Sequence, residues 1–512
     1  METKRLIIAM LFVVAAVQTV FSGDKIVVVG QNVENFYYSL DLEGNSDTKR
    51  QAKMDAIVNA YFPSDNSVPI ADIYAFCEVE CSDEMMQYIA SSFKAKTGLN
   101  FQASLDGMTY DKSYYSSGLI KCGFVYNADK IKAVGDNVTT AIDNTAYTAR
   151  MRMQTFMSNA SGECFTLSMN HFKAFSKDAS QWDNDRQRRL ENAIALLKGL
   201  KKNYDPDILI MGDLNSEMGE ACLDQLVNAG YDEQLIKYAG PTAWTHCYGG
   251  GEIIDHVFAN STMAQQVTNV EVKAANYCSL ADETQAFSDH NFYVVTLDLK
   301  EAEFHCEDIA FSESFSADFG QFTTVNTAGT KEWLINTSYS CANINAYQNG
   351  VNDDWLISHM FDLRQKTGAT LTFNQCAGYG VTTAWTSQMQ VLVSDNYFDH
   401  IGKPNEATWT VLESVFDTSG NYKWKKNAIS IPNQFVGKDK VFIAFHYTCG
   451  ESDIPSWEVK NVELTATCSE TGISTVNVYS QPTMTRKVLE NGRMVIVAPN
   501  GSRYNVQGME IK

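Results

Sequence analysis

An acid–amide pair and an acid–histidine pair are the residues of this chain that could do chemistry. Gly212-Asp213-Leu214-Asn215 follows the apolar run 208–211, and Ser288-Asp289-His290 precedes the apolar run 292–297. Runs of this kind are typical of buried strands, so both pairs are expected at strand ends. A carboxylate, an amide and an imidazole held together could bind a divalent cation, orient water and move a proton. The two motifs together indicate metal-assisted attack on a phosphoryl group.

Other expected strands carry polar side chains of compatible kinds. These are Asn32 after the run 25–29, Glu78 after 73–76, His171 after 164–169, and Asp255 early in 254–259. Taken singly, each has a plain structural interpretation, because a Glu after a strand is usually a surface residue and a single His is usually solvated or packed in a core. The Gly-Asp-Leu-Asn motif alone could be a turn. Compatible groups at the ends of several separate strands favour one catalytic site over chance.

The first part of the chain alternates between strand-like and helix-like segments. The expected strands are 25–29, 73–76, 118–126, 164–169, 208–211, 254–259 and 292–297. The clearest helix is 183–200, where Leu190, Ile194 and Leu197 recur at helical spacing. Asp183 is expected to cap its first turn. This alternation predicts an α/β sandwich over residues 24–299.

The order of the polar groups resembles that of the endonuclease/exonuclease/phosphatase superfamily, which has the DNase I-like fold. The matching positions are Asn32, Glu78, His171, Asp213-x-Asn215, Asp255 and Asp289-His290. The resemblance covers about residues 24–299 and implies a four-layer α/β/β/α sandwich with the site at one edge. The sequence departs from the family pattern at Cys77, where many members have Gln, and at Leu214, where Phe is common.

The resemblance implies a divalent metal ion held at one side of the site. By position, Glu78 is the metal-binding carboxylate, with Asn32 beside the metal and phosphate, and Asp289 helps at the metal or orients the site. Mg²⁺ is the expected cofactor because it prefers oxygen ligands, with Mn²⁺ or Ca²⁺ as alternatives.

The resemblance also implies catalytic roles for five residues. Asp213 and Asn215 orient the water and the scissile phosphate. His290 is the catalytic histidine, and Asp255 fixes its tautomer. His171 contacts the phosphate and is a candidate donor of a proton to the leaving oxygen. The group that removes the proton from the water is left open.

The fold does not fix the substrate, because the superfamily includes nucleases, sphingomyelinases and inositol-phosphate phosphatases. The local sequences at 32–35, 79–80 and 170–173 resemble those of bacterial secreted or membrane nucleases. This resemblance implies cleavage of DNA or RNA. Lys173 is then a candidate contact to a backbone phosphate, although a surface lysine is equally expected. Two other functions stay open: a phosphoesterase acting on phospholipid head groups or sugar phosphates, and a surface adhesion protein with an incidental hydrolase domain.

The charge of the chain limits how it could bind nucleic acid. A formal net charge of −21 argues against broad electrostatic capture of a polyanion. It does not exclude a nuclease, because a divalent cation neutralises the local field where the phosphate binds. Arg186, Arg188 and Arg189 are expected on a solvated helix face rather than in a phosphate-facing patch.

The beginning of the chain reads as an export signal. Lys4 and Arg5 precede the apolar run 6–17, which predicts a signal peptide at 1–22 and a secreted chain, extracellular or at the cell surface, with the periplasm as an alternative. The apolar run is short for a membrane span, so no stable membrane insertion is expected. The twelve Cys residues predict disulfides and buried thiols equally, without assigning pairs.

The composition changes after a linker at 300–310. Residues 311–467 are rich in Thr, Ser, Asn and aromatics with short alternating runs, which predicts an all-β sandwich. The segments 352–358 and 456–459 resemble jelly-roll modules of the choice-of-anchor type in secreted proteins of Bacteroidetes. Core packing of the six Trp residues is favoured over stacking on a surface glycan. The tail 469–512 resembles the C-terminal sorting signals of the same bacteria, which implies type IX secretion.

Overall fold

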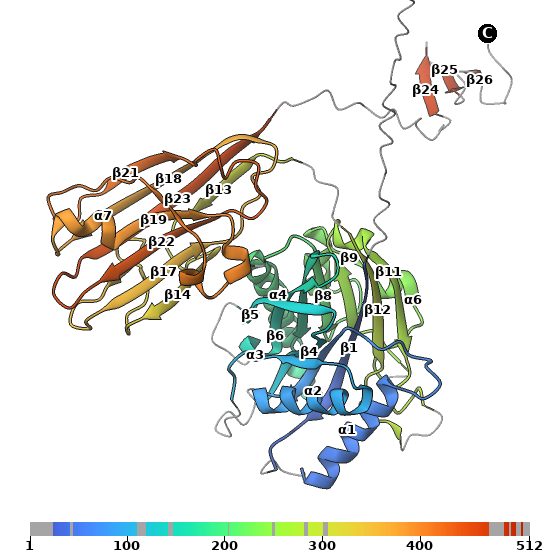
Figure 1. Cartoon of the computed structure of the whole chain (residues 1–512). Helices are drawn as coiled ribbons and strands as arrows, with labels where there is room; N and C mark the ends of the chain where they lie inside the picture. Colours follow the sequence, from blue (N-terminus) through green and yellow to red (C-terminus); the bar gives the residue numbers. More distant parts are fainter. Residues whose placement is uncertain are drawn as a thin grey trace, which may run out of the picture.

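Two six-stranded sheets form the centre of the first domain in the computed structural model (Figure 1). The structure describes residues 24–40, 45–109, 119–141, 147–202, 204–247, 251–280, 285–300 and 306–469, and the backbone of three short strands beyond them. The first sheet has the order β11-β12-β1-β2-β4-β3, and the second β5-β6-β7-β8-β10-β9. The strands of the first sheet are β1 (Asp24–Phe36), β2 (Ile73–Glu80), β3 (Phe101–Ser104), β4 (Ile120–Asn127), β11 (Val267–Lys273) and β12 (Phe292–Leu299). Those of the second are β5 (Ile131–Thr139), β6 (Met151–Ser158), β7 (Cys164–His171), β8 (Ile208–Asp213), β9 (Asp232–Glu233) and β10 (Asp255–Ala259).

The central strands are apolar on both faces, which explains why they appear in the sequence as unbroken apolar runs. In β1, Ile26 and Val28 pack between the two sheets. Val27 and Val29 point to the opposite face and pack under the helices. The strand β8 alternates in the same way between the inner core and the outer one. Each sheet is therefore buried between its partner sheet and a helical layer.

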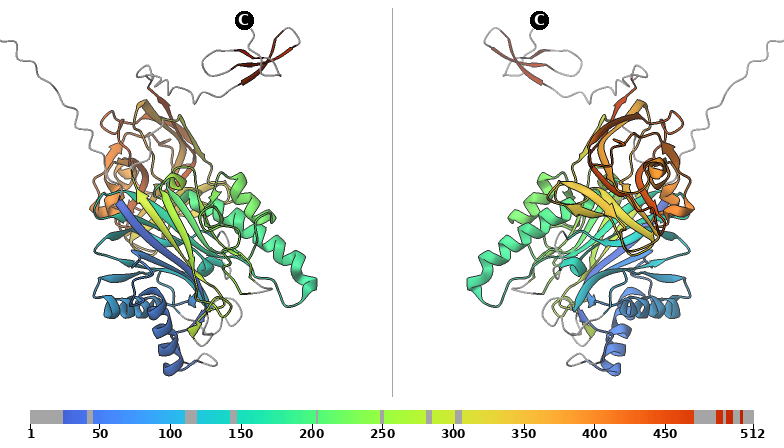
Figure 2. Two further views of the ribbon diagram at one scale, coloured as in Figure 1. Left: turned by 90° about the vertical axis from the view of Figure 1, so that its right-hand side faces the viewer. Right: turned by 90° about the vertical axis from the view of Figure 1, so that its left-hand side faces the viewer.

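Helices cover the outer face of each sheet and complete four layers. The helices α1 (Asp47–Tyr61) and α2 (Asp83–Thr97) pack on the first sheet, and α4 (Trp182–Gly199) and α5 (Ala221–Asn228) pack on the second. Figure 2 shows the two pairs, blue and green, on opposite sides of the strands. Two short helices, α3 (Tyr147–Arg150) and α6 (Leu235–Ala239), lie in connections. The predicted α/β/β/α sandwich is confirmed.

The long helix α4 begins differently from the prediction. Gln181 occupies its cap position and makes no side-chain cap. Asp178 instead accepts a hydrogen bond from the Ser180 backbone N–H at 2.9 Å and caps the 3₁₀ turn Ala179–Gln181. Because this turn runs directly into α4, the helix needs no separate cap at Asp183, and that prediction is wrong.

A β-sandwich forms the second domain, as predicted. One sheet has the order β15-β16-β23-β18-β21, with β13 also paired to β23, and the other has the order β14-β17-β22-β19-β20. The elements are β13 (Ile309–Glu313), β14 (Phe322–Ala328), β15 (Leu334–Asn336), β16 (Cys341–Asn345), β17 (Asn352–Ser358), β18 (Lys366–Gly378), α7 (Trp385–Gln388), β19 (Met389–Ser394), β20 (Thr410–Leu412), β21 (Lys425–Ser430), β22 (Phe442–Cys449) and β23 (Ser456–Cys468). The first of these strands begins inside the segment predicted as linker.

Tryptophans fill the interior of the sandwich. Trp333, Trp385 and Trp457 belong to its central core and are almost fully buried. Trp355 is buried in a second cluster on the outer face of the β14-β17-β22-β19-β20 sheet. The indole rings of these four residues serve packing, as the core interpretation of the sequence predicted.

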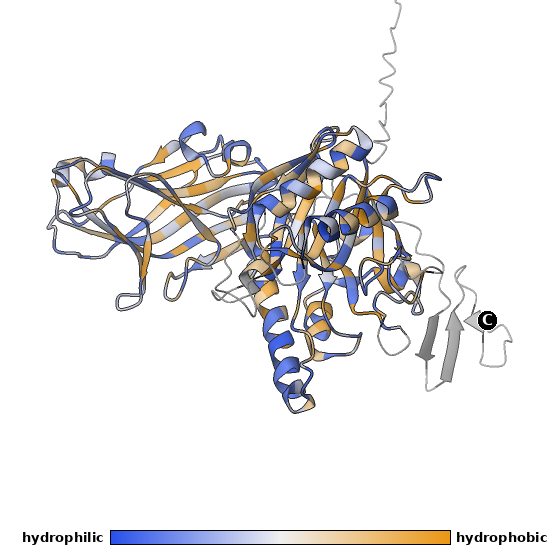
Figure 3. Cartoon of the chain, turned by 90° about the horizontal axis from the view of Figure 1, so that it is seen from below, coloured by the Kyte–Doolittle hydropathy of each residue, from blue (hydrophilic) through white to orange (hydrophobic). Residues whose placement is uncertain are grey.

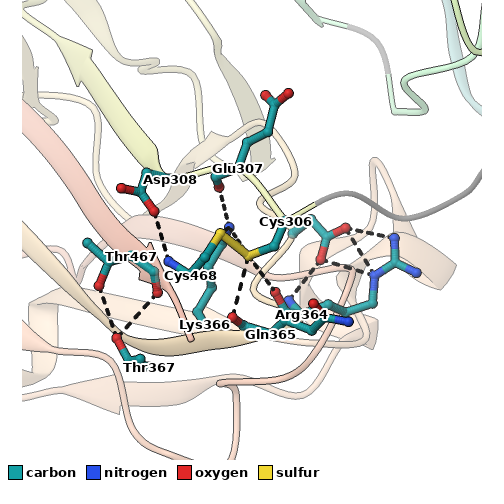
Figure 4. The surroundings of a disulfide bond; sticks show 10 residues. Cys306, Glu307, Asp308, Arg364, Gln365, Lys366, Thr367, Thr467 and Cys468 are labelled. Atoms are coloured by element: carbon teal, nitrogen blue, oxygen red, sulfur yellow. Dashed lines mark hydrogen bonds and ion pairs between the residues drawn. A yellow bond between two sulfur atoms is a disulfide. The ribbon is translucent and has the colours of Figure 1, made fainter. Parts of the chain in front are cut away.

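A disulfide between Cys306 and Cys468 joins the two ends of the second domain across 162 positions (Figure 4). Polar contacts surround it: the Cys468 backbone N–H donates to Asp308 Oδ1 at 2.8 Å, and the Lys366 ammonium donates to the Glu307 carbonyl. The second disulfide, Cys247–Cys278, lies in the first domain. The remaining eight Cys residues are buried free thiols, so the chain uses both forms that the sequence left open.

The outer face of the sheet that contains β17 packs against the first domain. Val134 and Cys164 of the first domain share a buried cluster with Trp355 and Tyr397. An exposed ion pair between Lys198 Nζ and Asp318, 2.5 Å apart, adds a polar contact. Figure 3 shows hydrophobic colours concentrated on the strands of both domains, with hydrophilic colours on helices and loops.

The ends of the chain are described only in part. The predicted signal peptide lies outside the described residues. In the predicted tail, the backbone of β24 (Arg486–Glu490), β25 (Arg493–Val497) and β26 (Arg503–Tyr504) is described. Within the parts of the chain that are described, no helix has the length and apolar character that a membrane crossing requires.

Candidate active site

Three neighbouring strands of the second sheet present polar side chains at the same edge. The strand β7 ends at His171 and β8 ends at Asp213, and these two residues are paired in the parallel register. The strand β10 begins at Asp255, which is paired with Asp213 on the other side. The register therefore sets His171, Asp213 and Asp255 in a row across the sheet edge.

The first sheet supplies the facing side chains. Asn32 lies opposite Cys77 in the parallel register of β1 and β2, and the register then shifts. Glu78, directly after Cys77, has φ +62°. A non-glycine residue in this left-handed region is uncommon and tends to occur where function requires a particular side-chain direction. His290 lies just before β12, which pairs with β1.

Gly212 allows the second sheet to close at this edge. Its φ of +131° is a conformation that side chains rarely adopt, and a Cβ at this position would lie 2.0 Å from the carbonyl oxygen of Asn170. The backbones of β7 and β8 can approach this closely only with glycine here. The glycine before Asp213 is therefore needed to place the carboxylate beside His171.

Glu78, Asp213 and His171 form a compact group around the amide of Asn32. The Asn32 Nδ2 group donates to Glu78 Oε1 and to Asp213 Oδ2, both at 3.0 Å. His171 Nε2 lies 3.6 Å from Glu78 Oε1 and 3.7 Å from Asp213 Oδ2. Asn32 thus presents its amide nitrogen to the carboxylates, while its oxygen accepts from the Glu34 backbone N–H.

This group fits a divalent cation. One ligand atom from each of Glu78, His171 and Asp213 lies within 4.8 Å of the others. Two carboxylates this close repel each other unless a cation or a proton lies between them. His171 Nδ1 is also buried without a hydrogen-bond partner. The residues present are therefore sufficient to hold a small hard cation, with Glu78 and Asp213 as the oxygen ligands.

His290 is held by two carboxylates. Its Nδ1 lies 2.7 Å from Asp255 Oδ2, and its Nε2 lies 3.6 Å from Asp213 Oδ2. Burial alone would lower the pKa of His290, but Asp255 and Asp213 outweigh it and raise this pKa to about 10. The imidazole is therefore positively charged at neutral pH, and Asp255 fixes the direction of its ring.

The other two titratable groups shift in the direction that burial dictates. Burial raises the pKa of Asp213 to about 7, with Asp255 acting in the same direction and His290 opposing. Burial lowers the pKa of His171 to about 4, against the pull of Glu78. The two histidines of the site are therefore in different states at neutral pH: His290 is charged and His171 is neutral.

Asp289 lies beside His290 and His246. Its carboxylate is 3.8 Å from His290 Nε2 and 3.6 Å from His246 Nε2. Burial alone would raise the pKa of Asp289, but the contact with His246 lowers it. His290 Nε2 is thus close to both Asp289 and Asp213, so this histidine connects Asp289 to the group around Glu78. With His246 and His290, Asp289 forms a second set of closely spaced ligand atoms.

His246 is the site residue that sequence reasoning missed. Its ring lies 4.6 Å from the ring of His290, and its Nδ1 contacts Glu252 at 2.8 Å. It lies in a loop between α6 and β10 without a regular apolar pattern, so no motif marked it. The only signal was its neighbour Cys247, whose disulfide to Cys278 fixes this loop beside Asp289.

Asn215 reaches the site through its backbone. Its N–H donates to Asp213 Oδ1 at 2.9 Å, and its side-chain amide donates to the Phe172 carbonyl at 3.1 Å. Its φ of +50° places it in the left-handed region. Asn215 is adjacent to the catalytic group and orients Asp213 directly.

Lys173 and Arg189, two of the four basic positions considered from the sequence, have partners in the structure. Lys173 Nζ lies 3.2 Å from the buried carboxylate of Asp185. Arg189 is fully buried, contrary to the expectation of a solvated helix face. Its guanidinium donates to the Asn215 carbonyl and to Ser216 Oγ, because α4 packs directly behind the loop after β8. Arg189 therefore supports the loop that carries Asn215.

Comparison with known proteins gave no match to a family model and none to a curated protein. Among solved structures, an endonuclease/exonuclease/phosphatase from Bacteroides vulgatus shares 16% identity, with a TM-score of 0.39, over 54% of this chain and 100% of its own. A family member from Bacteroides thetaiotaomicron shares 15%, with a TM-score of 0.38, over 55% and 100%. The human Nocturnin catalytic domain, solved with bound sulfate, shares 15%, with a TM-score of 0.37, over 54% and 96%.

Proposed function

We propose that the first domain is a metal-dependent phosphodiesterase that cleaves nucleic acid, DNA or RNA. The observation that supports this most directly is the convergence of Glu78, Asp213 and His171 with the charged His290 at one sheet edge. A cation site next to a fixed positive imidazole is the arrangement that stabilises negative charge on a phosphoryl group.

The position of each side chain in the site determines its proposed role. Glu78 and Asp213 would hold the cation, which supplies Lewis-acid polarisation of a phosphate oxygen when bound. Asp213 Oδ2 lies between the Asn32 amide and His290 Nε2, and it is the proposed acceptor for the proton of the attacking water. His290 donates from Nε2 to a phosphate oxygen, and Asp255 keeps the ring aligned. Neutral His171 donates to a second phosphate oxygen.

Features around the site favour a polymeric anion over a small phosphomonoester. A cavity of about 270 Å³ beside Asn35 is lined by Lys49, Arg50 and Lys53 of α1. The Asn35 backbone N–H bonds Glu78 Oε2 at 3.0 Å, so this basic cavity borders the metal group. A substrate with neighbouring phosphates could place one at the metal and another here.

Two exposed aromatic side chains lie in the chain segment that follows His171. Phe175, four residues after His171, is exposed and lies with its ring 5.2 Å from that of Trp182 at the start of α4. The Arg189 guanidinium lies over the Phe175 ring, 3.9 Å from its centroid, so Trp182 is the ring better suited to stacking on a base of a single strand. The basic cavity and this exposed indole are the features that favour a nuclease.

Export is the proposed setting of this activity. The two disulfides form and persist in oxidising compartments. Together with the predicted signal peptide they support a chain that acts outside the cytoplasm. The sorting role of the tail remains a prediction from its sequence.

Plasmid DNA and a structured RNA, each incubated with the mature chain and Mg²⁺, Mn²⁺ or Ca²⁺, test the proposal. Cleavage is expected with at least one metal and is lost on chelation. Asp213→Asn and His290→Ala should each lower the rate by about 10³-fold or more. His400→Ala, a half-buried histidine of the second domain, is the matched control and should leave the rate unchanged.

Two further substrates separate the alternatives. Release of phosphocholine from sphingomyelin, or of phosphate from a sugar phosphate, with DNA and RNA intact, would replace the nuclease by a phosphoesterase of small head groups. Inertness toward all four substrates would reject catalysis by this site altogether. Lys49→Ala with Lys53→Ala should raise KM for DNA and leave hydrolysis of bis-p-nitrophenyl phosphate unchanged, whereas Lys94→Ala with Lys96→Ala on α2 should do neither.

A further inference from the structure

A cavity of about 870 Å³ opens at one end of the β-sandwich. Three loops form it: the connection from β16 to β17, the residues after β18, and the connection from β22 to β23. The lining residues are Asn345, Tyr347, Gln348, Gly350, Tyr379, Gly380, Glu451, Ser452 and Ile454. These loops lie beside α7, at the end of the sandwich that points away from the first domain in Figure 1. The volume is within the range of about 300–1,000 Å³ that is typical of small-ligand sites.

Two tyrosines give this cavity its apolar surface. Tyr347 is 66% exposed and Tyr379 is 67% exposed, although most aromatic side chains of the domain are packed in its core. Tyr379 is supported by the ring of Tyr422, whose centroid lies 5.8 Å away in an edge-to-face arrangement. Both rings are therefore accessible to a ligand in the cavity.

Hydrogen bonds stabilise the loops that carry the two tyrosines. The buried Trp385 donates from its indole N–H to the Tyr379 carbonyl at 3.2 Å. The Asn349 amide donates to the Tyr347 carbonyl at 2.8 Å. Asp453 accepts from the Val381 backbone N–H. These bonds hold the backbone beside each tyrosine before any ligand binds, which reduces the entropy lost on binding.

The backbone is strained at two residues that line the cavity. Tyr379 has φ +61° and Gln348 has φ +66°. Left-handed conformations at non-glycine residues are costly and are kept mainly where a side chain must point in a given direction. Both residues line the cavity.

The polar lining disfavours an anionic ligand and suits one rich in hydroxyl groups. None of the lining residues is basic, so nothing here would neutralise a phosphate or a carboxylate. Gln348 and Asn345 offer amides, Ser452 a hydroxyl and Glu451 a carboxylate that accepts from hydroxyl groups. An apolar protein segment would leave these polar groups unpaired on binding.

We propose that this cavity binds a neutral oligosaccharide, with pyranose faces stacked on Tyr347 and Tyr379. Sugar rings present C–H groups on their faces and hydroxyl groups at their rims, which matches planar rings flanked by amides and a carboxylate. The sequence favoured core packing of the tryptophans over glycan stacking, and Trp333, Trp355, Trp385 and Trp457 are indeed buried. The site is separate from the phosphoesterase centre, and it would hold the domain on a glycan surface.

Affinity electrophoresis of the full mature chain tests the proposal. Gels contain one polysaccharide each: starch, hydroxyethylcellulose, mannan, xylan or galactan, with polygalacturonate as an acidic comparison. Retardation by at least one neutral polysaccharide is expected, followed by titration calorimetry with its hexasaccharide. Tyr347→Ala and Tyr379→Ala should each weaken binding about 3- to 10-fold, and the double variant should abolish retardation.

Tyr339→Ala is the matched control, because Tyr339 is 62% exposed on the same domain and lies outside the cavity. It should leave binding unchanged. All three tyrosines are at the surface, so the unfolding temperature reports whether each variant is intact. No retardation by any neutral polysaccharide, retardation by polygalacturonate alone, or binding that survives in the double variant would each overturn the proposal. Nuclease assays of the same variants are expected to match the unaltered chain, so the two proposals fail independently.

Discussion

The two domains use opposite placements of their functional side chains. In the first domain, polar groups from facing sheets converge at a buried edge: His171, Asp213, Asp255 and His290 are each at most 4% exposed. In the second domain, the interior is apolar and rich in tryptophan, and the candidate ligand groups lie on exposed loops. Burial strengthens electrostatic interactions and shifts pKa values, which chemistry needs, whereas stacking needs only a fixed and accessible ring. The difference fits the two proposals, catalysis by the first domain and ligand binding by the second.

The largest effect is expected from the carboxylate behind the catalytic histidine. Asp255→Asn should lower the rate of phosphodiester hydrolysis by about 10³- to 10⁴-fold, because His290 loses the partner that fixes its ring and supports its charge. Steady-state kinetics measures the loss, and calorimetry should show an unchanged unfolding temperature for the second domain. A loss of less than tenfold would show that burial of charge at this edge is not catalytic.

The two disulfides allow the same change to be made in each domain. Cys306→Ser with Cys468→Ser should lower the free energy of unfolding of the sandwich by roughly 2–5 kcal/mol and leave hydrolysis at 25 °C unchanged. Cys247→Ser with Cys278→Ser should instead lower hydrolysis, since this bridge fixes the loop of His246. Denaturant unfolding measures the stability of both variants, and steady-state kinetics measures their rates of hydrolysis. Equal effects of the two pairs on activity would contradict the division of roles.

A pair of adjacent aspartates tests buried charge in the second domain. Burial raises the pKa of Asp354 to about 7, against hydrogen bonds from Asn326 and Asn352. A carboxyl with a raised folded-state pKa stabilises less as the pH rises from about 4 to 7. Asp354→Asn should therefore raise stability by roughly 1–3 kcal/mol at pH 8 and change little at pH 4.

Asp353 is the control, because its pKa shifts in the opposite direction to that of Asp354. Burial alone would raise its pKa, but a hydrogen bond with His446 Nε2 at 2.9 Å lowers it. Its stabilising contribution is present above pH 4 and is lost in acid. Asp353→Asn should lower stability at pH 8 by about 1 kcal/mol. Urea unfolding at the two pH values measures both variants, and a common sign at pH 8 would contradict the assignment.

The smallest effect is expected at the edge of the catalytic group. His246→Ala should lower kcat by about tenfold, or about 1.4 kcal/mol, because His246 orients Asp289 and packs on His290 without reaching the metal group. Replacement by Gln should restore part of the rate by keeping a contact to Asp289. An unchanged rate in the Ala variant would limit the site to the residues that the sequence predicted.

The sequence predicted those parts of the molecule whose signal is local. Asp213 and Asn215 follow an unbroken apolar run because β8 is buried on both faces, and that run marks a strand end. The helix α1 had no such signal, since only Met54, Ile57 and Tyr61 of its residues are buried. The predicted site residues were found where a strand end marked them, and His246, in an irregular loop, was not.

The pairing of distant cysteines and the exposure of individual tyrosines could not be predicted from the sequence, because both depend on the complete fold. Cys306 and Cys468 are brought together by the pairing of β13 with β23, which depends on the whole sandwich. The exposure of Tyr347 and Tyr379 depends on loops fixed by Trp385 and Asn349, and no local pattern separates such tyrosines from buried ones. The six tryptophans gave a composition that fits both a core and a binding face.

The bridge between Cys306 and Cys468 also has a mechanical consequence. The chain enters the second domain beside one of these residues and leaves it beside the other. Tension applied between the first domain and a point of attachment beyond residue 469 would run through the sulfur–sulfur bond and bypass the strands. The sandwich would not extend under such a load, and the sugar-facing loops would keep their shape while the chain is pulled. Single-molecule stretching should therefore show no lengthening from this domain until a reductant is added.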